Sequence, residues 1–186
     1  MKIMKTLKLF CKTVTIGALL FSGSALAWSA GKIDREVDAT IKVFQEEVNG
    51  ANVFLNQAAG YVVFPRVIKI GVAFGGETGE GALRVGGKTV GYYRTTAGSF
   101  GLQLGAQAKS IVIAFMTQEA LQKFQTSSGW KVGVDGSVAL IDIGVGKTID
   151  SDNIKDPVVG FIFGSKGLMY NLTLEGSKFT KLDKSR

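Results

Sequence analysis

The amino-acid sequence predicts an α+β fold: two N-terminal helices, then a mainly antiparallel β-sheet system, sandwich- or barrel-like, with one inserted helix. Two observations support this. Apolar residues recur every three or four positions over 33–48, the period of a helix, whereas from residue 61 they recur at every second position, the period of a strand. Glycine-rich joints separate the alternating stretches, and no linker divides them. We therefore expect a single domain over residues 28–186.

The first 27 residues have the layout of a secretory signal peptide. Four lysines and no acidic residue precede a short apolar stretch over 14–21, and small residues occupy the −3 and −1 positions of a cut after Ala27. Cys11 precedes the apolar stretch, which argues against a lipid-modified cysteine. We expect a periplasmic or secreted protein that begins at Trp28. A retained N-terminal anchor is the alternative.

The expected mature chain contains neither histidine nor cysteine. This composition excludes Ser-His-Asp and Cys-His nucleophiles, the usual zinc and copper sites, and haem or iron–sulfur ligation by these side chains. We therefore predict a protein that is not an enzyme and that has no cofactor or metal. Without the leader, 18 basic and 15 acidic residues remain. That balance is too weakly basic for a nucleic-acid partner but allows weak attraction to anionic membranes.

Two helices are predicted before the strands. The first covers residues 33–48 and ends at Gly50, and its acidic polar face favours packing on the core over binding to a membrane. The second is expected over 53–59, with Asn52 as its N-cap and Gly60 as its stop.

The rest of the chain predicts strands around one further helix, for which Thr117 is the expected N-cap. Alternation predicts half-buried strands over 67–74, 132–140 and 168–174, and the apolar run 110–116 predicts a strand buried on both faces. The expected joints are Gly75-Gly76, Gly79, Gly81, Gly86-Gly87 and a hairpin turn from Gly164 to Gly167.

Two kinds of motif are incomplete. Gly-Lys-Thr triplets at 87–89 and 146–148 lack the glycine that a phosphate loop needs five positions earlier, so we interpret them as turns. The run 150–153 begins like a calcium loop, but Ile154 and Lys155 occupy positions that need Asp or Asn and then Gly. A solvated loop is the preferred interpretation, and a loose calcium site is the alternative.

Two acidic residues, Glu77 and Glu80, flank glycines in one predicted loop. A carboxylate pair can perform general acid–base chemistry without histidine. A carboxylate-dependent hydrolase acting on envelope material is therefore the alternative function, although acids in a glycine-rich loop are usually only solvated.

Residues 58–175 resemble the SYLF domain family. The run 99–107 (SFGLQLGAQ) is the most specific part of the resemblance, and the other matching stretches keep their order along the chain. They are Phe64-Pro65, Lys69, Gly71, the glycine joint over 75–81, residues 131–138, and residues 165–176. The resemblance implies phospholipid binding, with phosphoinositides as ligands of eukaryotic members and actin as a partner of some of these. It implies no catalytic residue.

We therefore predict a non-catalytic phospholipid- or membrane-binding protein of the cell envelope. The candidate head-group ligands are the basic residues of the SYLF-like part: Arg66, Lys69, Arg84, Lys88, Arg94 and Lys109. The candidate motif residues are Phe100, Gly101, Gln103 and Gly105. Several strands also have one unusually small face, which fits either tight packing or a groove for an acyl chain. The small residues are Gly71, Ala73, Gly101, Gly105 and Gly133.

Overall fold

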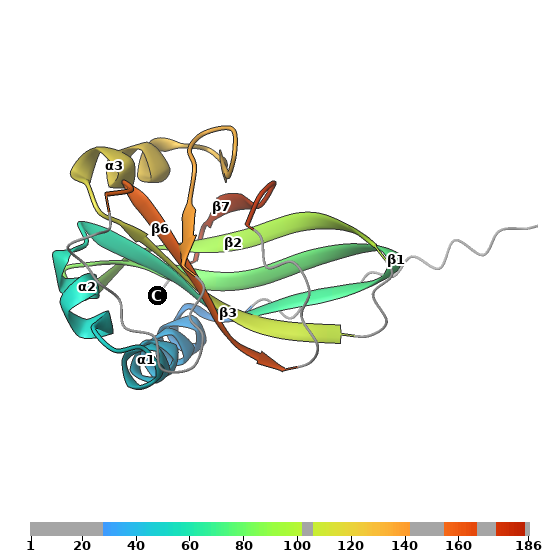
Figure 1. Cartoon of the computed structure of the whole chain (residues 1–186), viewed down its shortest axis with the longest axis horizontal. Helices are drawn as coiled ribbons and strands as arrows, with labels where there is room; N and C mark the ends of the chain where they lie inside the picture. The colour runs from blue at the N-terminus through green and yellow to red at the C-terminus, as the bar shows by residue number, and fades with distance from the viewer. Residues whose placement is uncertain (1–27, 102–105, 142–154, 167–173, 185–186) are drawn as a thin grey trace, which may run out of the picture.

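The computed structural model describes residues 28–101, 106–141, 155–166 and 174–184, and Figure 1 shows a curled sheet with helices on both of its faces. The described strands form one sheet in the order β4-β7-β2-β1-β3-β6-β5, antiparallel except for the pair β5–β6. The predicted α+β class is confirmed. The elements are α1 (Ala30–Glu47), α2 (Ala51–Gln57), β1 (Gly60–Val85), β2 (Lys88–Gly101), β3 (Ala106–Phe115), α3 (Gln118–Thr126), β4 (Trp130–Lys131), β5 (Ala139–Ile141), β6 (Val158–Lys166) and β7 (Lys178–Leu182).

The first helix forms where its apolar spacing predicts it. Ser29 is the N-cap, and its side chain accepts a hydrogen bond from the backbone N–H of Lys32. Ile33, Val37 and Phe44 are fully buried in the core that the helix shares with the sheet. The apolar stripe of α1 is therefore covered by the protein's own core, as its acidic polar face led us to expect.

The second helix begins earlier than predicted. Gly50 is its N-cap, with a left-handed φ of 86°, and Asn52 lies inside the helix instead of capping it. Glycine adopts positive φ without steric cost, so it reverses the chain between two helices that almost adjoin. Phe54 and Leu55 then face the same core as α1.

The glycine joint predicted over 75–81 is not a break, because β1 passes through it as a strand of 26 residues. These glycines permit close contact. A Cβ atom on Gly81 would lie 2.0 Å from the carbonyl oxygen of Val63, and one on Gly79 would lie 2.6 Å from that of Arg66. The second half of β1 therefore lies face to face with its first half, which requires the strand to bend back on itself.

The bend of β1 defines the end of the sheet that lies farthest from the helices (Figure 1). The first half of the strand pairs with β3 up to Ile70, and the second half pairs with β2 from Ala73 onward. The predicted turn at Gly86-Gly87 is confirmed, and both glycines have positive φ. We call residues 70–76, 98–101 and 106–108 the distal end.

Strand β3 lies between β1 and β6, and its residues 111–115 are buried on both faces, as predicted. Val112 and Ala114 face the core beneath α1 and α2, whereas Ile111, Ile113 and Phe115 face a second core beneath α3. The cap predicted for α3 is also confirmed, since the Thr117 hydroxyl accepts the Ala120 N–H. None of the helices in the described ranges is long and apolar enough to span a bilayer.

The strand predicted over 132–140 is wrong. Strand β4 ends at Lys131, a turn with Gly133 at a φ of 84° follows, and β5 begins only at Ala139. The Asp135 carboxylate accepts the backbone N–H of Lys131 and closes this turn. The residues that alternate in the sequence therefore belong to a turn and two short edge strands instead of one strand.

The hairpin turn predicted from Gly164 is also wrong where it is described. Strand β6 continues to Lys166, and Gly164, with a φ of 65°, lies where the register with β3 shifts. Glycine here serves a β-bulge. Several predictions lie outside the described residues: the leader over 1–27, the triplet at 146–148, the loop over 150–153, and the strand over 168–174 except for Leu174.

Candidate functional site

The structure separates the six basic residues that we predicted as head-group ligands. Lys69 and Lys109 meet at one carboxylate, whereas Arg84 and Arg94 belong to two other ion-pair clusters. Arg66 is exposed at a β-bulge of β1, and Lys88 is exposed after the β1–β2 turn. Of the six, only Lys69 and Lys109 therefore lie in the same cluster within the described residues.

Arg84 anchors α1 to the sheet. It is 8% exposed, and its Nη2 donates to Asp38 Oδ1 at 2.6 Å and lies 3.7 Å from Asp34 Oδ1. Its other amino group donates to the Gly87 carbonyl at 3.4 Å. Since the buried guanidinium is already paired with the carboxylates of α1, it is not positioned to bind an external phosphate.

Glu80 forms a second cluster that joins both ends of the described chain. Its Oε1 accepts from Arg94 at 2.7 Å, and its Oε2 accepts from Lys184 at 2.8 Å and from the Trp28 N–H at 3.1 Å. Burial raises the pKa of Glu80, but the hydrogen bonds from Lys184 and Arg94 outweigh it and hold the pKa below its ordinary value. Arg94 is thus part of a structural tie.

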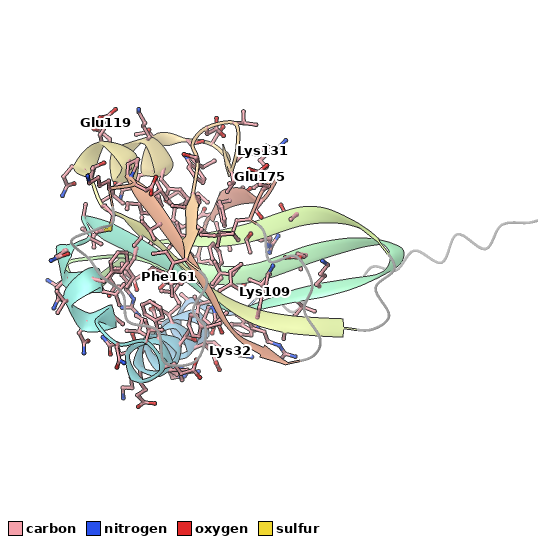
Figure 2. All side chains as sticks on the ribbon, viewed as in Figure 1. Lys32, Lys109, Glu119, Lys131, Phe161 and Glu175 are labelled. Carbon is pink, nitrogen blue, oxygen red and sulfur yellow. The ribbon has the colours of Figure 1, made fainter. Side chains whose placement is uncertain are left out.

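Glu77 forms the third cluster. Its Oε2 lies 2.7 Å from Lys109 Nζ, and its Oε1 lies 3.4 Å from Lys69 Nζ. The exposed fractions of the side chains are 6% for Lys109, 13% for Glu77 and 16% for Lys69. Two ammonium groups therefore share one carboxylate in a largely buried position, and Figure 2 shows Lys109 on the sheet.

The bend of β1 assembles this cluster. Val67 of β1 pairs directly with Lys109 of β3, and Lys69 lies two residues further along the same face of β1. Eight residues of straight strand would separate Lys69 from Glu77 by roughly 26 Å. Because Gly79 packs against the first half of β1, the second half returns and brings Glu77 to both lysines.

The cluster lies next to stretches of β1, β2 and β3 that contain no charge. The sequence has no charged residue over 70–76 or over 95–108, and much of both stretches is apolar residues and glycine. Phe100 and Gly101 of the predicted motif lie there, paired with Phe74 and Ala73. The two other motif residues lie outside the described residues: Gln103 and Gly105.

Glu77 and Glu80 do not form the carboxylate pair on which the hydrolase alternative depends. Residues three apart in an uninterrupted strand point to opposite faces, and both glutamates lie in regular register with β2. Each carboxylate is also held by its own basic partners. Sequence analysis missed Glu77 as the partner of the lysines because it placed residues 75–81 in a loop; the alternation of Glu77, Gly79 and Gly81 indicates the shared face.

The glycines and alanines that we predicted to form small strand faces have different roles in the structure. Gly79 and Gly81 serve tight packing, as does Gly160, where a Cβ would lie 2.8 Å from Val138. Gly133 lies in a turn and not in a strand. The remaining small residues lie at the distal end or outside the described residues: Gly71, Ala73, Gly101 and Gly105.

Residues 96–185 match the family model described as Ysc84, Las17-binding protein actin regulator. The match agrees with the resemblance to the SYLF family that the sequence shows. The SYLF family is lipid-binding and actin-related, and it is generally non-enzymatic. The matched residues include Phe100, Gly101 and Lys109, whereas Lys69 and Glu77 precede them. A comparison with curated proteins finds no match to the chain.

Proposed function

We propose that this protein binds phospholipid at a membrane of the cell envelope and catalyses no reaction. The observation that carries the proposal is the convergence of Lys69 and Lys109 on Glu77 at the root of the uncharged distal end. The lysines supply positive charge for a phosphate, and the stretches 70–76 and 95–108 beyond them contain no charged residue.

The uncharged distal end suits contact with lipid. Moving a charged side chain into an apolar phase is costly, so a segment that enters the interface of a bilayer is expected to lack such side chains. Residues 70–76 and 95–108 meet this condition over parts of three neighbouring strands. The helices lie away from this end (Figure 1), so it is free to approach a membrane without moving them.

The basic pair suits a phosphate head group. A lysine ammonium has three donors, and Glu77 engages both lysines through one oxygen each. Lys69 is the more exposed of the two. A phosphate oxygen therefore has donors available at the root of the distal end without any need to break the shorter Lys109–Glu77 pair.

The family supports lipid binding, and the leader selects the compartment. The SYLF family is lipid-binding and actin-related, and the predicted signal peptide directs the chain out of the cytoplasm. We therefore transfer the lipid property to this protein and not the Las17 or actin partner. A hydrolase gains no support, because the two glutamates on which it depends face opposite ways.

Co-sedimentation with liposomes tests the lipid proposal. Wild-type protein is expected to sediment with phosphatidylglycerol–phosphatidylcholine vesicles more than with phosphatidylcholine vesicles, and less so at high salt. Lys69→Gln/Lys109→Gln is expected to weaken binding by about tenfold or more. The matched control is Lys131→Gln/Lys178→Gln, which removes an exposed cross-strand lysine pair of the same charge elsewhere on the sheet.

Circular dichroism first establishes that both double variants fold. Failure of the wild type to sediment with either vesicle overturns the proposal, and so does an equal loss in the two double variants. The compartment is tested separately by the intact mass of the protein recovered from cells. A chain that begins at Trp28 supports export, and a chain that retains the leader contradicts it.

A further inference from the structure

The charge balance of the Glu77 cluster points to one class of phospholipid. We propose that the cluster selects a phosphodiester head group, which carries one negative charge, over a phosphomonoester, which carries nearly two. This inference rests on the proposed function and adds a ligand class to it. It follows from a count of charges in a site that is poorly exposed to water.

The cluster carries one uncompensated positive charge. Lys69 and Lys109 contribute two, and Glu77 cancels one of them. The distal stretches beyond the cluster add nothing, since the sequence has no charged residue over 70–76 or 95–108. An unbalanced charge in a poorly solvated site is unfavourable, so a ligand with a single negative charge is the one that brings the cluster to neutrality.

The two phosphate classes differ in charge by enough to be distinguished. A phosphomonoester carries about −1.5 to −2 at neutral pH because its second pKa is about 6. A phosphodiester lacks that second proton and stays singly charged. The additional negative charge of a monoester would face the Glu77 carboxylate, which is itself largely buried. Like charges in such a place repel more strongly than they do in water.

The distances assign separate roles to the two lysines. Lys109 is nearly inaccessible, at 6% exposed, and holds Glu77 at 2.7 Å. The Nζ of Lys69 lies farther from Glu77, at 3.4 Å, and the Lys69 side chain is more exposed, at 16%. Lys69 is therefore the residue that contacts the phosphate, whereas Lys109 is a positioning residue that keeps Glu77 in the site as the group that rejects the second charge.

Two short-chain lipids with identical acyl chains provide the probes. Dihexanoyl phosphatidylglycerol is the diester and dihexanoyl phosphatidic acid is the monoester, and isothermal titration calorimetry gives the ratio of their dissociation constants. Wild-type protein is expected to bind the diester about tenfold more tightly. Glu77→Gln, which raises the cluster charge by one, is expected to reverse that preference.

A second variant restores the original charge. Glu77→Gln/Lys109→Gln leaves Lys69 as the contact and returns the cluster to one positive charge, so the diester preference is expected to return. If Glu77→Gln does not fold, Lys69→Gln provides the test, because it neutralises the cluster and should remove the discrimination. Retention of the wild-type ratio in Lys69→Gln overturns the inference.

The outcomes separate this inference from the proposed function. A wild-type protein that sediments with vesicles but binds the monoester equally or more tightly overturns the ligand class alone. An unchanged ratio in folded Glu77→Gln protein does the same, as does failure to bind either short-chain lipid. A protein that fails to sediment with any vesicle overturns the proposed function as well.

Discussion

Two glutamates of β1, three residues apart, each lie beside two basic side chains, but those partners come from different parts of the fold. Glu77 and Glu80 each form ion pairs with two basic side chains. Glu80 also accepts the Trp28 N–H, and its partner Lys184 donates to the Trp28 carbonyl at 2.5 Å. The Glu80 cluster thus joins a residue before α1 to one after β7, whereas the three ion-paired residues of the Glu77 cluster come from β1 and β3.

This difference shows how the same ion-pair chemistry serves two purposes. Around Glu80, the ligands are backbone and side-chain groups from distant parts of the chain, and Arg94 is 39% exposed, so solvent screens part of the charge. Around Glu77, both partners are largely buried at the root of a stretch without charge. The first arrangement closes the fold, and the second holds an unbalanced charge in place.

The largest expected effect is that of a substitution at Gly81, the residue that follows Glu80. Gly81→Ala places a Cβ 2.0 Å from the Val63 carbonyl oxygen. Because that oxygen belongs to the backbone, the clash is relieved only if one half of β1 moves. We expect a loss of about 3 kcal/mol or more in the free energy of unfolding, measured by urea denaturation. Gly76→Ala is the control, since the nearest atom to its Cβ is the Ala97 carbonyl oxygen at 3.8 Å. Equal effects of the two substitutions would contradict the face-to-face packing.

The next largest effect compares the glutamates directly. Glu77→Gln leaves two largely buried lysines without a counter-charge, and we expect it to destabilise the fold by about 3 kcal/mol. In Glu80→Gln, Lys184 is also largely buried, at 11% exposed, but Arg94 is more than a third exposed and solvent screens its charge. We expect a loss of about 1 kcal/mol there. Urea denaturation of both variants at neutral pH measures the difference, and a larger loss in Glu80→Gln would reverse our assignment.

The comparison also shows where prediction from the sequence succeeds. The buried faces of α1 and the doubly buried strand β3 follow from the spacing of apolar residues alone, because each pattern records which side of the element meets the core. The cap of α3 at Thr117 is equally local. Such features depend on neighbours within a few positions, which a sequence displays directly.

Prediction fails where glycine reports on distant backbone. Gly79 and Gly81 have the same local signal as a turn, and only the approach of Val63 and Arg66 from the first half of β1 explains them. The error then carried over to the site, because a loop over 75–81 hides that Glu77 faces Lys69. The lysines themselves were predicted as ligands, whereas their shared carboxylate was assigned to a different chemistry.

Acid titration tests the contribution of Glu80 to stability, and we expect a smaller effect than those above. Because hydrogen bonds from Lys184 and Arg94 hold the pKa of Glu80 below its ordinary value, its stabilisation is fully present above that ordinary value, near 4.5. It is lost as the pH falls through the lowered pKa of the folded state. We therefore expect the stability difference between wild type and Glu80→Gln to shrink on acidification. A difference that stays constant between pH 7 and about pH 2 would show that the tie is not electrostatic.

The smallest expected change in stability is the most informative about purpose. Lys69→Met/Glu77→Leu/Lys109→Met replaces the whole Glu77 cluster with apolar side chains, and replacement of a complete buried ion cluster is often neutral or stabilising. We expect the free energy of unfolding to stay within about 1 kcal/mol of wild type, while sedimentation with phosphatidylglycerol vesicles is lost. A triple variant that still binds these vesicles as wild type does would show that the charges serve the fold alone. The same replacement at Glu80 would leave the Trp28 N–H without its acceptor and should destabilise the protein. This pair of results, unchanged stability and lost binding, is what we expect of charges that serve a ligand site and not the fold.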